Sequence, residues 1–171
     1  MSTKLIRRAL IASGLFISAA VAFSPTAFAA PTDTVNLSGE IATQATIEAT
    51  DTAGATALNL GGEGTIVTDA VVKVADLTMS TNNASGLKIS LVGGTLIGTL
   101  TGIGTPITYQ VAVATNGQTP ATGDYSANIS GLSVSNSPAE VEKDLYIRYS
   151  APAINDPDTY EGSILLTVAD N

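Results

Sequence analysis

The chain has 171 residues, a mean hydropathy of +0.30 and a formal net charge of −8 at pH 7. It contains no cysteine, tryptophan or histidine, which excludes disulfides, thiol or imidazole catalysis and the usual His/Cys zinc sites. The acidic balance argues against nucleic acid and anionic lipid as partners, because both are bound through clusters of Lys and Arg.

The first 29 residues have the anatomy of a secretory signal peptide. A short region with three cations is followed by a largely apolar run over 9–23 and by the small-x-small triplet Ala27-Phe28-Ala29. We predict cleavage after Ala29, export through the inner membrane, and a mature chain that begins at Ala30. The apolar run is short for a bilayer-spanning helix, so we expect no membrane span in the mature form.

The mature chain is expected to be one domain with an unusual core. All three phenylalanines lie in the first 29 residues, so the core must be built from Val, Ile, Leu, Ala and five tyrosines. All fifteen acids remain, against only four cations, which are Lys73, Lys88, Lys143 and Arg148. We interpret this charge as a source of solubility.

The first element after the cleavage site is the segment Thr34–Ile41. If it is extended, its alternate residues share one face, which holds Val35, Leu37, Gly39 and Ile41. The opposite face is polar, with Asn36, Ser38 and Glu40. Such an amphipathic strand can pair within its own sheet, or it can complete the sheet of a neighbouring molecule.

Further along the chain, apolar residues alternate with polar ones in runs separated by turn residues about every ten positions. This spacing is typical of an all-β sandwich or barrel. The run Val71–Met79 is a long predicted strand with a change of register near Ala75-Asp76. Other predicted strands have buried faces at Leu87, Ile89 and Leu91; at Ile107, Tyr109, Val111 and Val113; at Tyr125, Ala127 and Ile129; at Leu145, Ile147 and Tyr149; and within Ser163–Ala169.

Weaker patterns fill the gaps between these strands. The Gly-punctuated stretch Leu96–Ile103 predicts a poor strand or an edge element. Asn136–Pro138 is expected to be a turn, and Ala151–Thr159 a Pro/Asp loop. Only Pro138–Lys143 has the composition of a helical turn.

The segment Thr34–Ile41 resembles the N-terminal donor strand of chaperone–usher fimbrial subunits of the type 1 and P-pilus kind. Those donors also follow a signal peptide closely and alternate apolar residues with one glycine. The late segments Gly123–Ser126 and Asp158–Gly162 resemble the entries to late strands in such pilins, and the cysteine-free colonisation-factor pilins are similar in general plan. This chain departs from type 1 subunits in having no disulfide after the donor, and from many pilins in ending Ala169-Asp170-Asn171 rather than with a penultimate tyrosine.

The resemblance implies an all-β, immunoglobulin-like sandwich over 45–171, preceded by an extension over 30–44 that carries the donor strand. Its function would be that of a structural subunit of a surface fimbria or pilus-like fibre, assembled by donor-strand exchange and serving adhesion or biofilm formation. The expected partners are identical or related subunits, a periplasmic chaperone and an outer-membrane usher. The expected interaction residues are Val35, Leu37, Gly39 and Ile41, and no cofactor is expected.

The alternative is a monomeric secreted β-sandwich that binds calcium or carbohydrate. Asn155, Asp156, Asp158 and Glu161 offer hard oxygens of the kind calcium prefers, although their spacing is not that of an EF-hand. Glu140, Glu142 and Asp144 alternate along the chain, and we interpret them as a solvated strand face. The sequence has no G-x-S-x-G element and no placed carboxylate pair, so we expect no enzyme activity.

Overall fold

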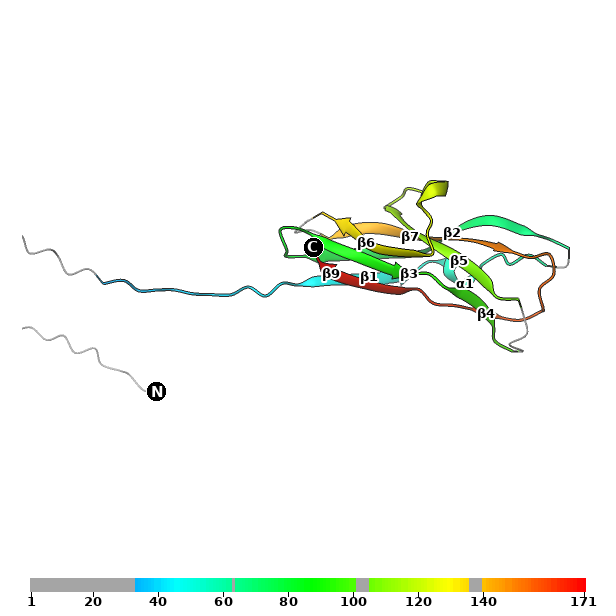
Figure 1. Cartoon of the computed structure of the whole chain (residues 1–171), viewed down its shortest axis with the longest axis horizontal. Coiled ribbons are helices and arrows are strands. Elements are labelled where there is room, and N and C mark those ends of the chain that lie inside the picture. The colour runs from blue at the N-terminus through cyan, green and yellow to red at the C-terminus, as the bar shows by residue number, and fades with distance from the viewer. Residues whose placement is uncertain (1–32, 63, 101–104, 136–139) are drawn as a thin grey trace, which may run out of the picture. The chain divides into compact units, whose positions relative to one another are not determined.

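Figure 1 shows the computed structural model, which describes residues 33–171 except 63, 101–104 and 136–139. The predicted signal peptide and the predicted turn at 136–138 lie outside the described residues. In chain order the elements are β1 (Ala45–Asp51), α1 (Ala53–Thr56), β2 (Val67–Thr81), β3 (Leu87–Val92), β4 (Thr95–Gly98), β5 (Ile107–Thr115), the 3-10 turn η1 (Thr122–Asp124), β6 (Asn128–Val134), β7 (Val141–Ala151), β8 (Tyr160–Glu161) and β9 (Leu165–Asp170).

These strands form two antiparallel sheets that pack as a sandwich. Within the described ranges, one sheet has six strands in the order β1-β2-β7-β5-β4-β8, and the other has three in the order β6-β3-β9. The predicted all-β class is therefore confirmed. Helical structure is confined, in the same ranges, to α1 and η1.

The strand order is that of an immunoglobulin-like domain, in which the sheet A-B-E-D faces the sheet C-F-G. Here β1-β2-β7-β5 reproduce A-B-E-D, and the neighbours β3 and β9 reproduce C and F. The position of strand G is on the edge of β9 that faces away from β3. No strand of the described chain occupies that position.

The core lies between the sheets and follows the predicted alternation. Leu87, Ile89 and Leu91 of β3 are at most 1% exposed, because every second side chain of a strand points to the same face. The register of β2 shifts between Lys73 and Ala75. This bulge confirms the predicted change of register near Ala75 and lets one extra residue into β2.

Three local predictions were wrong. Residues 141–143 form the start of β7 instead of a helical turn, because Val141 pairs with Met79 of β2. The strand expected from Tyr125 begins only at Asn128, after η1, and the Tyr125 ring lies under the guanidinium of Arg148 at 5.0 Å. The short helix α1 lies outside Pro138–Lys143, which is the one segment expected to have a helical turn.

Candidate subunit interface

The predicted donor segment is exposed. Residues 33–44 belong to no helix or strand. The side chains of Val35, Leu37 and Ile41 are 80%, 91% and 88% exposed, and a Cβ added to Gly39 would meet no atom within 4 Å. Which sheet this segment joins stays a prediction.

Two sheet edges lie side by side in the sandwich. β1 is the last strand of the six-stranded sheet and β9 the last strand of the three-stranded sheet. Figure 1 shows them running next to each other, and the two strands are in contact. Each has one edge without a partner strand among the described residues, so its backbone N–H and C=O groups are available for pairing there.

A hollow of about 370 Å³ lies between these edges. Its floor is the apolar core face of the large sheet, and its walls come from β1, α1 and the start of β9. A second hollow, of about 430 Å³, shares Leu58, Leu96 and Gly162 with the first. The residues that line the first include Ala49, Leu58, Val74, Leu96, Tyr109, Ile147, Ile164 and Leu166.

The inward side chains of the two edge strands are incompletely covered. Leu166 and Val168 of β9 are only half-buried, although their partners across the ladder, Leu91 and Ile89, are fully buried. Ile47 of β1 is half-buried too, opposite the buried Met79. The core is thus closed in its centre and open along the line where β1 meets β9.

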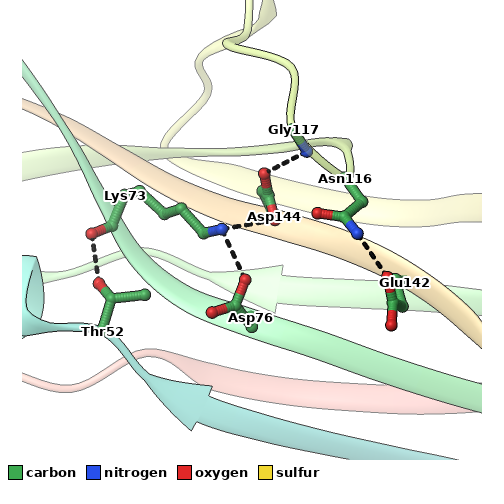
Figure 2. Close-up of polar contacts among 7 residues, drawn as sticks. All are labelled: Thr52, Lys73, Asp76, Asn116, Gly117, Glu142 and Asp144. Atoms are coloured by element: carbon green, nitrogen blue, oxygen red, sulfur yellow. Dashed lines mark hydrogen bonds and ion pairs between the residues drawn. The ribbon is translucent and has the colours of Figure 1, made fainter.

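A charged cluster connects β2 and β7 of the large sheet (Figure 2). The Lys73 ammonium of β2 contacts Asp76 at 2.6 Å and Asp144 of β7 at 2.9 Å. The other Asp144 oxygen accepts a hydrogen bond of 2.8 Å from the backbone N–H of Gly117, in the turn after β5. Asp144 is only 1% exposed, so the prediction that it shares a solvated face with Glu142 was wrong.

The protonation of this cluster follows from its contacts. Hydrogen bonds to Asp76 and Asp144 raise the pKa of Lys73 far above its usual range. Burial alone would raise the pKa of Asp144, but the hydrogen bonds from Lys73 and Gly117 outweigh it, and the pKa is lowered. A lysine whose pKa is raised in this way is a poor nucleophile or base. Its contacts and the hydrogen bond from Gly117 join β2, β7 and the 115–117 turn.

In the acidic loop before β8, an aspartate accepts hydrogen bonds from backbone N–H groups of the same chain. The Asp158 carboxylate accepts hydrogen bonds from the N–H groups of Leu100 and Thr159 at 3.0 and 2.7 Å. Carboxylate oxygens held in this way are turned toward the chain itself. No group of three or more acidic residues in the described part of the chain is arranged to hold a metal ion.

No family model matches the chain, and no curated protein matches it. Among the helices described, none is long and apolar enough to cross a membrane.

Proposed function

We propose that this chain is the structural subunit of a surface fimbria or pilus-like fibre that assembles by donor-strand exchange. Residues 34–41 of one copy would lie along the free edge of β9 in the next copy, at the position of strand G. The observation that carries the proposal is the pairing of an open edge with an apolar hollow, in a chain that also has an exposed amphipathic segment.

The two surfaces are complementary in chemistry. The free edge of β9 offers unpaired backbone groups, and an added strand would satisfy them. Val35, Leu37 and Ile41 would meanwhile bury their side chains against the half-covered residues of β1 and β9. Burying one such side chain contributes about 1.5–3 kcal/mol, before the cost of ordering the segment is subtracted.

Gly39 gives the sharpest test of this proposal. It shares a face with Val35, Leu37 and Ile41, so Gly39→Leu would place a bulky side chain against the floor of the hollow. The same change leaves the subunit's own fold unstrained, because no atom lies within 4 Å of the added Cβ. Ser38→Leu is the matched control, since it adds the same side chain to the opposite face.

The mature protein from Ala30 onward should form oligomers at micromolar concentration. We expect them to survive detergent at room temperature and to dissociate on boiling, as seen on gels and by light scattering. Gly39→Leu should abolish these oligomers, whereas Ser38→Leu should retain them. A strictly monomeric wild-type protein whose residues 35–41 are protected from amide exchange would overturn the proposal in favour of a self-complete sandwich.

A further inference from the structure

A single side chain extends the β1–β2 ladder past the start of β1. Asn82 directly follows Thr81, the ladder partner of Ala45. Its backbone N–H donates to the Gln44 carbonyl at 3.2 Å, its Oδ1 accepts from the Gln44 N–H at 2.7 Å, and its Nδ2 donates to the Ala42 carbonyl at 2.9 Å. One partner is a donor and the other an acceptor, so the orientation of the amide is fixed by its contacts. We call these three hydrogen bonds the Asn82 clamp.

The clamp lies at the end of the sandwich where β9 ends. Ala45 at the start of β1 pairs with Thr81, and Asp170 at the end of β9 pairs with Leu87, on the other side of the same turn. The backbone N–H of Asn171 also donates to the Gly86 carbonyl at 3.1 Å. β1 therefore runs away from this end of the sandwich, whereas β9 runs toward it.

These directions restrict what residues 34–41 can do within their own chain. To lie between β1 and β9 of the same molecule, the chain would have to reverse within residues 42–44. Such a reversal breaks the hydrogen bonds of the Asn82 clamp. It also makes the segment run parallel to β9, which is the slightly less stable way to pair two strands.

A segment from a second molecule has neither restriction. It can enter the hollow in the opposite direction and pair antiparallel with β9, while residues 42–44 of its own chain stay in line with β1. The same clamp that disfavours pairing within one chain leaves pairing between chains unaffected.

We infer that Asn82 is a positioning residue that directs residues 34–41 away from their own β9 and toward the β9 of a second copy. The inference rests on the proposed function. Asn82 lies in an exposed turn, so its role is to bias a choice between two partners, and the core does not depend on it.

The test compares Asn82→Ala with Asn83→Ala in the mature protein. Asn83 lies in the same turn and its Oδ1 also accepts one backbone hydrogen bond, from Ser85 at 2.9 Å, so its replacement loosens the turn but leaves the hydrogen bonds to Ala42 and Gln44 in place. Removing both side-chain bonds of Asn82 should raise the concentration needed for assembly about tenfold, the equivalent of about 1.4 kcal/mol. In the monomers that remain, amide exchange of residues 35–41 should become slower. Asn82→Asp, which keeps the acceptor for Gln44 but loses the donor to Ala42, should have an intermediate effect.

The outcomes separate this inference from the proposed function. If the wild type assembles, and Asn82→Ala assembles at the same concentration as Asn83→Ala, Asn82 is only a turn residue and the inference fails alone. If the wild type does not assemble at any concentration, the proposed function fails and the inference falls with it. A drop in thermal midpoint that is equal in both variants, without a change in assembly, would also count against the inference.

Discussion

The segment 34–41 and strand β3 carry the same kind of pattern and have opposite fates. In β3, Leu87, Ile89 and Leu91 alternate with more polar residues and are at most 1% exposed. In the N-terminal segment, Val35, Leu37 and Ile41 alternate in the same way and are at least 80% exposed. Alternation is a property of the sequence, but burial requires a partner surface. β3 has β6 and β9 beside it and the large sheet in front of it, whereas the segment has an unsatisfied apolar face.

The largest effect expected from this comparison is on the buried side. Ile89→Ala removes a core side chain that is 0% exposed, from the central strand of the three-stranded sheet. The lost burial and the cavity left behind should lower the free energy of unfolding by about 2–5 kcal/mol. Urea unfolding of the monomeric Gly39→Leu background would measure this loss without interference from assembly. A loss below about 1 kcal/mol would mean that β3 is not central to the core.

A second comparison concerns Glu142 and Asp144, two acids of β7 that are two residues apart. Asp144→Ala removes the buried partner of Lys73 and of the Gly117 N–H, and should lower the free energy of unfolding by about 2 kcal/mol at pH 7. Glu142→Ala removes an exposed acid of the same strand, whose only hydrogen-bond partner among the described residues is the side chain of Asn116, and should change it by less than about 0.5 kcal/mol.

The pH dependence sharpens this second comparison. Because folding lowers the pKa of Asp144, its contribution is complete above the unfolded pKa of about 3.9 and is lost as the pH falls through the lower, folded pKa. The difference between wild type and Asp144→Ala should therefore be constant near neutrality and shrink below about pH 4. Equal effects of Asp144→Ala and Glu142→Ala at pH 7 would contradict the buried ion pair.

The smallest effect expected is that of Leu37→Ala on a single molecule. Leu37 is 91% exposed, so in the monomeric Gly39→Leu background its truncation should change the free energy of unfolding by less than about 0.5 kcal/mol. In the otherwise wild-type protein the same truncation should weaken assembly by about 1.5–3 kcal/mol, since the proposed donor-strand pairing buries the Leu37 side chain. A large loss of stability in the monomeric background would show that Leu37 packs within its own chain.

The central strands could be predicted from the sequence because their signal is local. Apolar residues occupy every second position in the segments Leu87–Leu91, Ile107–Val113 and Leu145–Tyr149. The bulge in β2 is indicated by two successive apolar residues, Val74 and Ala75, which break the alternation. The incomplete edge beside β9 could not be predicted in this way, because it depends on which strands become neighbours.

The burial of Asp144 is a feature that the local sequence pattern does not predict. In sequence it looks like Glu142, two residues before it, and nothing local separates the two. What differs is that the turn after β5 places the Gly117 N–H on Asp144, while Lys73 reaches across from β2. Both contacts come from segments distant in the chain, so only the folded arrangement reveals them. The sequence feature that could have indicated this contact is the scarcity of cations, since Lys73 is one of four Lys and Arg residues after residue 29.

The tyrosine in the floor of the hollow has an optical consequence. Tyr109 lines the space between β1 and β9, and its hydroxyl donates to the Ser163 carbonyl, just before β9, at 2.6 Å. Burial raises the pKa of this hydroxyl. The chain has no tryptophan to mask tyrosine emission. Arrival of a strand in the hollow would change the surroundings of this natural chromophore, so the assembly proposed above could be followed in real time by ultraviolet fluorescence of the unlabelled protein.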